Sequence, residues 1–203
     1  MKHIKHIRPI GHIIFTTLLL FVSVTDMVLF AAEGVKSAAT ANNAQAWKKA
    51  LQDVGFTVFP EAQALPVIRV PGLDGKQIDI KDFAGAFVIL NFWATWCPPC
   101  KAEMPSMETF YKTFKDKQLT IFAISTGEKP DTVQSFIKAN PHSFPIGLDS
   151  SGQLGAIFAG RGIPTTYIVN PEGKAIAGTI GGRDWMDKKT VEAFTILLSS
   201  GKK

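Results

Sequence analysis

Apolar runs and amphipathic stretches alternate along the chain from about residue 65 to residue 200. "AFVILNFWA" (86–94) and "LTIFAIS" (119–125) are nearly continuous apolar runs, which are typical of strands covered on both faces of a sheet. Shorter runs predict further strands at 65–70, 76–80, 144–149, 165–170 and 175–181. Apolar residues at helical spacing predict helices at 101–117, 130–140, 152–159 and 187–200. Strands that alternate with helices in this way predict an α/β fold.

The segment before this pattern, residues 33–63, is rich in alanine and only loosely patterned. Within it, Trp47, Leu51 and Val54 recur at helical spacing, and Gly55 follows as a helix end. We therefore predict a linker that carries one short helix.

Residues 1–32 have the layout of a targeting segment. A basic start, "MKHIKHIR", is followed by an apolar stretch and by small residues. The run at 10–32 contains Asp26 as its only charged residue and is long enough to span a bilayer. We therefore predict a secretory signal peptide or a membrane anchor, whose basic end stays in the cytoplasm. In both cases the linker and a domain at 64–203 are periplasmic or otherwise extracytoplasmic, with a tether to the inner membrane if the segment is retained.

The composition narrows the class of partner. Of the 203 residues, 46% are hydrophobic and 19% are charged, and a chain of this length buries a core without the help of disulfides. The formal net charge of +5 is small, and no basic run interleaved with aromatic residues occurs. The sequence therefore predicts no nucleic-acid partner.

Both cysteines of the chain, Cys97 and Cys100, lie in "FWATWCPPCKAEMP" (92–105). A structural disulfide between them would close almost no loop, so its stabilising effect would be small. A zinc site takes about four nitrogen or sulfur ligands. Beyond the N-terminal segment the only histidine is His142, which we expect at the surface. The sequence therefore predicts no metal site, although two thiolates suffice to hold copper(I).

A redox role explains more of this stretch. The cysteine pair follows a buried strand and opens a helix, because Pro98 and Pro99 fit the first helical turn. Cys97 then occupies the N-cap, where free backbone N–H groups and the helix dipole stabilise a thiolate. Such surroundings lower a cysteine pKa from about 8.5 to roughly 3.5–7.5. We therefore predict that Cys97 attacks a substrate disulfide and that Cys100, one turn further into the helix, resolves the mixed disulfide.

The same stretch resembles the thioredoxin superfamily, and in particular the membrane-associated TlpA/ResA-like thiol–disulfide oxidoreductases of bacteria. The resemblance covers residues 65–199 and includes "DGKQIDIKDFAG" and "GIPTTYIVNPEGK". It implies a thioredoxin fold, in which helices flank a central mixed β-sheet. It also implies disulfide exchange with protein substrates and a reducing role, often in cytochrome c assembly, with electrons from a membrane thiol carrier. The cysteine pair is then the redox group, and no cofactor is expected.

The resemblance also assigns roles to residues around the cysteines. Pro164 in "GIPTT" matches a cis-proline opposite the cysteines, which presents the backbone of Ile163 to a substrate peptide. Trp96 matches a tryptophan beside the attacking cysteine, and we expect Trp96 and Pro98 to line the substrate-binding surface. Pro105 matches a kink in the active-site helix.

Glu103 is the candidate acid of the site. It follows Cys100 by three positions, so the two residues share one helix face. A carboxylate beside a buried thiol can relay its proton. The resemblance supports this role, because thioredoxins carry a buried aspartate where this chain has Asn91, and TlpA/ResA-like proteins carry an acid after the cysteines instead. The alternative is a solvent-exposed helix glutamate without a chemical role.

Two other functions compete with disulfide exchange. A peroxiredoxin places its reactive cysteine in a P-x-x-x-T-x-x-C setting, and here Leu90 and Ala94 occupy the two required positions. A copper-binding metallochaperone usually has a longer cysteine spacing and a histidine, and neither is visible here. Thiol–disulfide exchange is therefore the favoured prediction.

Overall fold

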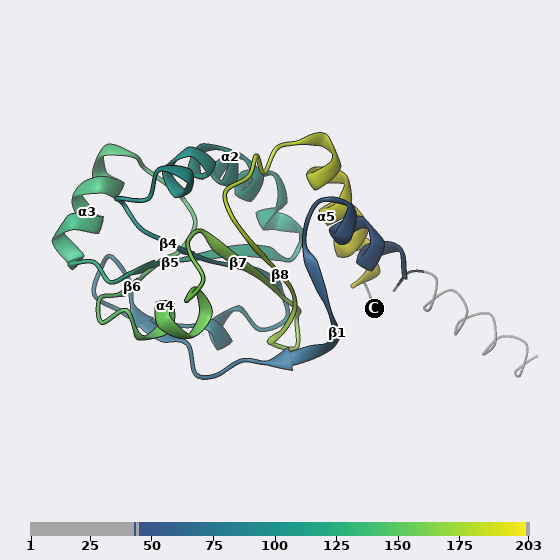
Figure 1. Ribbon diagram of the computed structural model, residues 1–203, viewed down its shortest axis with the longest axis horizontal. Helices are drawn as coiled ribbons and strands as arrows, with labels where there is room; N and C mark the ends of the chain where they lie inside the picture. Colours follow the sequence, from purple (N-terminus) through teal and green to yellow (C-terminus); the bar gives the residue numbers. More distant parts are fainter. Residues whose placement is uncertain (1–42, 44, 202–203) are drawn as a thin grey trace, which may run out of the picture. The chain divides into compact units, whose positions relative to one another are not determined.

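The computed structural model describes residues 43 and 45–201, so the predicted signal or anchor segment lies outside them. A six-stranded sheet forms the centre of the domain (Figure 1). The strand order is β1-β8-β7-β4-β5-β6, in which β4, β5 and β6 run parallel and β7, β8 and β1 pair antiparallel with their neighbours. The sheet is therefore mixed, as the resemblance implied. Its strands are β1 (Thr57–Ala64), β4 (Phe87–Trp93), β5 (Leu119–Thr126), β6 (Ile146–Asp149), β7 (Thr165–Val169) and β8 (Lys174–Ile180).

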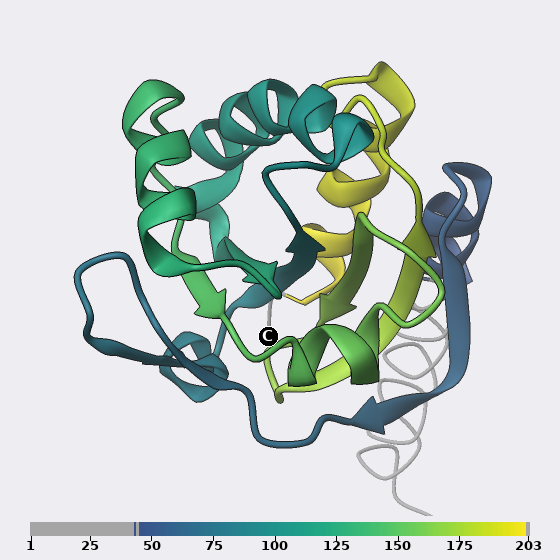
Figure 2. The same ribbon diagram turned by 60° about the vertical axis from the view of Figure 1, so that its left-hand side comes forward.

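Helices cover both faces of this sheet. Figure 2 shows α2 and α3 on one face and α4 on the other. A hairpin of β2 (Arg69–Pro71) and β3 (Gln77–Asp79) packs on the same face as α4. None of the helices in the described ranges has the length and apolar character that a membrane crossing requires. The remaining elements are α2 (Pro98–Phe114), α3 (Pro130–Ala139), α4 (Gln153–Phe158), α5 (Lys188–Ser200), η1 (Ile80–Phe83) and η2 (Lys115–Lys117).

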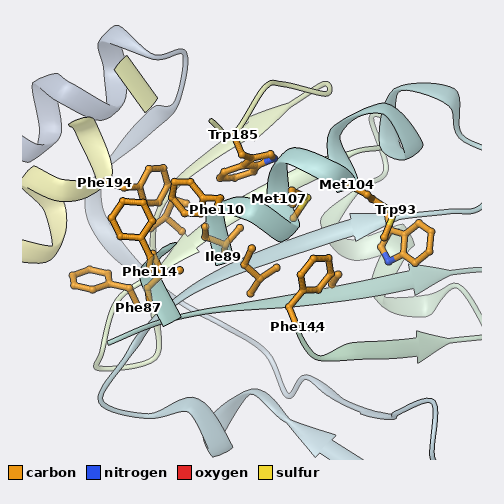
Figure 3. Close-up of a cluster of buried hydrophobic side chains, with 14 of the residues drawn as sticks. Phe87, Ile89, Trp93, Met104, Met107, Phe110, Phe114, Phe144, Trp185 and Phe194 are labelled. Carbon is orange, nitrogen blue, oxygen red and sulfur yellow. The ribbon is translucent and has the colours of Figure 1, made fainter. Parts of the chain in front are cut away.

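Strand β4 is buried along its whole length, and its side chains alternate between the two faces of the sheet. Phe87, Ile89 and Trp93 pack in the larger core cluster, under α2 and α5 (Figure 3). The alternate residues of β4 pack in a second cluster, under α4 and the hairpin. Asn91 lies on the same face of β4 as Phe87, Ile89 and Trp93, so its polar side chain faces α2. The larger cluster also contains Met104, Met107, Phe110, Phe114, Trp185 and Phe194.

The strands and helices predicted from residue 65 onward are present, with bounds that differ by a few residues. The short helix of the linker is also confirmed, because residues 45–53 are helical and Leu51 is fully buried. Trp47 and Val54 pack against the same core. Gly55 ends this helix with a φ of 85°, where its N–H donates to the carbonyl of Gln52 at 2.9 Å.

Strand β1 is missing from the sequence predictions, which place residues 57–63 in the linker. In the structure this segment pairs antiparallel with β8, for example Thr57 with Gly178. The strand lies at the edge of the sheet and most of its side chains are exposed, so the sequence shows no alternation of buried and exposed positions. It also contains Pro60, which edge strands tolerate.

The expectation that His142 lies at the surface is wrong. The His142 side chain is only 6% exposed, and its ring stacks on Phe144 with 5.1 Å between the ring centroids. Phe144 is a core residue two positions further along the chain, and the imidazole packs with it. The sequence shows His142 only as a lone histidine among polar loop residues, so the sequence gives no sign of this contact with Phe144.

Candidate active site

The junction of β4 and α2 positions the two cysteines. Cys97 is the N-cap of α2, and Pro98 and Pro99 occupy the first helical positions, as predicted. The Cys97 sulfur accepts a hydrogen bond from the backbone N–H of Cys100 at 3.3 Å. It therefore lies where the unpaired N–H groups and the positive end of the helix dipole favour negative charge.

Cys97 and Cys100 form a disulfide. Cys97 is 3% exposed and Cys100 is 0% exposed, so Cys97 is the slightly more accessible of the two. Both cysteines belong to the core cluster beneath α2.

The loop before β7 lies against this disulfide. The Ile163–Pro164 peptide bond is cis, as the resemblance implied. The Cys97 sulfur is 3.7 Å from the carbonyl oxygen of Ile163. The carbonyl of Pro164 in turn accepts a hydrogen bond from the N–H of Gly181 at 2.8 Å, which joins this loop to the end of β8. Two segments far apart in the sequence therefore meet at the Cys97 sulfur.

The rim of the site is apolar. Trp96, directly before Cys97, is 66% exposed, which is unusual for so large a hydrophobic side chain. Pro98, directly after it, is also exposed. An exposed tryptophan beside a buried disulfide is a surface that a partner can cover.

Glu103 lies inside the protein, so the alternative prediction of a solvent-exposed helix glutamate is wrong. The residue is 2% exposed, and both carboxylate oxygens accept hydrogen bonds. The Asn91 side-chain amide donates to Oε1 at 3.0 Å, and the Arg183 backbone N–H and Trp185 Nε1 donate to Oε2 at 3.2 and 3.3 Å. Burial raises the pKa of Glu103 from 4.5 to about 7, against the opposite effect of these donors and of the Arg183 charge. A carboxyl group with a pKa near neutrality can both accept and release a proton at physiological pH.

Three residues of the site were not predicted from the sequence. Arg183 and Trp185 follow β8 in "GGRDW" and reach Glu103 across 80 and 82 positions of chain. Glu128 follows β5 and accepts hydrogen bonds from the backbone N–H of Thr95 and the hydroxyl of Ser125, both at 2.8 Å. Their one signal in the sequence was a charged or aromatic residue within four positions of the end of a predicted strand.

Pro105 lies inside α2, where the resemblance placed it. Within the part of the chain that the structure describes, no group of three or more histidine, cysteine, aspartate or glutamate side chains is arranged to hold a metal ion. The methionines of α2, Met104 and Met107, are buried in the core.

The fold and the site together define a class of protein: a thioredoxin-fold enzyme that carries a redox-active disulfide, that is, a thiol–disulfide oxidoreductase. The AhpC/TSA family model matches residues 62–177, and the chain belongs to this family. Its curated relatives include proteins named thiol-disulfide oxidoreductase ResA. The ResA of Bacillus subtilis (strain 168) is 38% identical over 159 residues, which cover 73% of this chain and 87% of that protein. The ResA of Bacillus thuringiensis subsp. konkukian is 38% identical over 133 residues, 61% of this chain and 77% of that protein.

Solved structures support the same fold. StoA from Bacillus subtilis superposes with a TM-score of 0.53 at 30% identity, over 68% of this chain and 97% of that one. A putative thiol:disulfide interchange protein DsbE from Chlorobium tepidum superposes with a TM-score of 0.61 at 26% identity, over 71% of this chain and 99% of that one. The thioredoxin fold and the thiol–disulfide oxidoreductase class predicted from the sequence are thereby confirmed.

Proposed function

We propose that this protein reduces disulfides of protein substrates outside the cytoplasm, with Cys97 as the attacking residue. The observation that carries this proposal is the position of the Cys97 sulfur. It sits at the N-cap of α2 and 3.7 Å from the Ile163 carbonyl oxygen, at the one slightly exposed end of the disulfide. The backbone of Ile163 and Pro164 can pair with an extended substrate peptide, and Trp96 and Pro98 can cover its apolar side chains.

The reaction balances as a two-electron exchange. The Cys97 thiolate attacks one sulfur of the substrate disulfide, which breaks the substrate S–S bond and forms a mixed disulfide. Cys100 then attacks the Cys97 sulfur, releases the second substrate thiol and forms the Cys97–Cys100 disulfide. The Cys100 thiol must lose its proton for this step, and Glu103 is the buried base on the same helix face. The substrate gains two electrons, and the enzyme is left oxidised, as in the structure described here.

Repeated turnover needs a donor of electrons to the oxidised cysteine pair, and the enzyme needs a location in the cell. We assign the donor role to a membrane thiol carrier, and the tether to residues 10–32. The resemblance to TlpA/ResA-like proteins supports both assignments, and it favours cytochrome c maturation or general disulfide reduction as the process served. The cysteine pair itself carries the electrons, so the mechanism calls for no further cofactor.

The first test is insulin reduction by the wild type and the Cys97→Ser variant. We expect the variant to lose all activity, because no thiolate remains at the N-cap of α2. Cys100→Ser is the matched control, since it keeps the attacking thiol and should accumulate a mixed disulfide with the substrate. Retained activity in Cys97→Ser contradicts the assignment.

The direction of electron flow is tested by the redox equilibrium of the cysteine pair against glutathione. A reductase should remain largely oxidised in a buffer where glutathione is mostly reduced but not in large excess. A pair that glutathione reduces readily is instead an oxidant. Peroxide consumption in the same preparations distinguishes the peroxiredoxin alternative, because disulfide exchange consumes none.

A further inference from the structure

The loop between β8 and α5 supplies two of the three hydrogen-bond donors that hold Glu103. These are the backbone N–H of Arg183 at 3.2 Å and Nε1 of Trp185 at 3.3 Å, both to Oε2. A loop that carries two donors for one buried carboxylate must itself be held in place, because a shift of about 1 Å breaks a hydrogen bond of this length.

The side chain of Arg183 holds this loop. Its Nη1 donates to the carbonyl of Val54 at 3.0 Å, and its Nη2 donates to the hydroxyl of Thr179 at 3.2 Å. The guanidinium carbon lies 4.2 Å from the centroid of the Phe56 ring, which is the geometry of a cation–π contact. Arg183 therefore ties the loop to the segment directly before β1.

That segment is the C-terminal end of the helix at 45–53 and the turn that follows it. Its own backbone is also tied to β8, because the Thr179 hydroxyl donates to the carbonyl of Gly55 at 3.1 Å. Phe56 packs edge-on against Trp185 with 6.4 Å between the ring centroids. The part of the chain before the sheet is thus joined to the two loop residues, Arg183 and Trp185, that contact Glu103.

Arg183 also acts on Glu103 through its charge. The guanidinium is partly desolvated, and burial lowers its own pKa while Glu103 opposes that change. In return the positive charge lowers the pKa of Glu103, although burial outweighs it. Glu103 and Arg183 line a shallow groove of about 500 Å³ next to α2. The other charged residue that lines this groove is Asp184. The strands under Glu103 contribute neutral groups, Asn91 and Thr166.

We propose that Arg183 is a positioning residue for proton transfer, which joins the segment 45–56 to Glu103 and keeps the Glu103 carboxyl group oriented. The inference rests on the proposed role of Glu103 as the base for Cys100. The short helix before the sheet thereby has a function in the proton transfer, because its C-terminal end holds the Arg183 guanidinium.

The test measures Glu103 directly in the oxidised protein, where no cysteine titrates. Proteins labelled with ¹³C at the glutamate carboxyl carbon are titrated by NMR, and Glu103→Gln identifies the resonance. We expect Arg183→Gln to raise the titration midpoint of Glu103 by roughly half a pH unit to one unit, because a nearby positive charge is lost and the side chain no longer holds the loop donors in line with Oε2. Lys188→Gln, which removes an exposed charge at the start of α5, should leave the midpoint unchanged. An unchanged midpoint in Arg183→Gln overturns the proposal.

Two further variants keep the test decisive if Arg183→Gln does not fold. Arg183→Lys retains the charge without the planar contacts, and Phe56→Leu retains Arg183 without the ring beneath it. Both should move the Glu103 midpoint in the same direction by a smaller amount. If neither variant moves it, the segment 45–56 is not coupled to Glu103 and the proposal fails.

The pH dependence of thiol alkylation in the reduced protein separates this inference from the role of Glu103. We expect Arg183→Gln to shift the thiol profile in the wild-type background and to add nothing in the Glu103→Gln background. Equal shifts in both backgrounds mean that Arg183 acts on the cysteines directly, which overturns the proposal. If Glu103→Gln alone leaves the thiol profile unchanged, the proton-transfer role of Glu103 fails, whatever the NMR midpoint shows.

Discussion

The side-chain amide of Asn91 donates one hydrogen bond to Oε1 of Glu103 and a second to the hydroxyl of Thr166, both at 3.0 Å. The amide thereby joins β4, α2 and β7 at one buried point. An amide nitrogen donates to either protonation state of a carboxyl group. Asn91 can therefore hold Glu103 in place without competing for its proton, which suits a chain with a single buried acid at this position.

Replacing Asn91 with aspartate should disturb this arrangement. Two carboxyl groups at hydrogen-bond distance share one proton, so Asn91→Asp should raise the pKa of Glu103 above its value of about 7. We expect the alkylation profile of the reduced cysteines to move to higher pH, and insulin reduction at neutral pH to fall. Thr166→Val is the control, because it removes the other partner of Asn91 and leaves the contact with Glu103. An unchanged alkylation profile in Asn91→Asp contradicts the role of Glu103 as the base.

The raised pKa of Glu103 also predicts how stability depends on pH. Its pKa is about 7 in the folded protein against 4.5 for an ordinary glutamate, so the folded state binds the proton more tightly than the unfolded state. The stabilisation from this proton is complete below the unfolded pKa of 4.5 and is lost as the pH rises through about 7. The loss amounts to about 3 kcal/mol, because each pKa unit corresponds to about 1.4 kcal/mol.

Urea unfolding of the oxidised protein between pH 4 and pH 8 checks this prediction, with Glu103→Gln as the comparison. The variant should lack the decline that the wild type shows as the pH rises. His142 contributes to the pH dependence with the opposite sign, because burial lowers the pKa of His142 from 6.5. The difference between wild type and variant removes that contribution. Parallel stability curves for the two proteins would show that folding does not raise the pKa of Glu103.

The parts of the fold that the sequence predicts are those with a strong local signal. The apolar runs of β4 and β5 and the prolines after Cys97 each specify their own structure through neighbours in the chain. Strand β1 has no such signal, because an edge strand is held mainly by backbone hydrogen bonds to β8. Side-chain periodicity says nothing about those bonds.

The same distinction applies to the active site. Cys97, Cys100 and Glu103 lie at the start of α2, within its first two turns. Their spacing in the sequence is therefore enough to predict how they lie relative to one another. The donors from Arg183 and Trp185 come from 80 and 82 positions away, and no local pattern connects them to Glu103. The burial of Glu103, and hence its raised pKa, depends on this loop, and so it could not be read from the helix sequence.

Glu128 anchors the loop that carries Cys97, the proposed attacking cysteine. Its carboxylate accepts hydrogen bonds from the backbone N–H and the hydroxyl of Thr95, and from the hydroxyl of Ser125. Thr95 is followed by Trp96 and Cys97, whose N–H donates to the carbonyl of Ala94 at 3.2 Å. The turn at the end of β4 is thus fixed by one buried carboxylate.

We expect Glu128→Ala to lower the free energy of unfolding by about 2 kcal/mol, because it leaves a buried N–H and two hydroxyls without their acceptor. Insulin reduction should slow by roughly ten- to a hundredfold, since the Cys97 sulfur is no longer held in its reactive position. Glu128→Gln keeps the shape and can accept from the Thr95 N–H, so most of both losses should be recovered in that variant.

Glu172→Ala is the matched control for this experiment, because Glu172 is an exposed glutamate in the turn between β7 and β8. An exposed substitution of this kind should change the free energy of unfolding by no more than about 0.5 kcal/mol. The informative comparison is between stability and rate. If Glu128→Ala unfolds more easily but reduces insulin at the wild-type rate, Glu128 supports the fold alone, and the position of Cys97 must be set by the start of α2 and by the loop at Ile163.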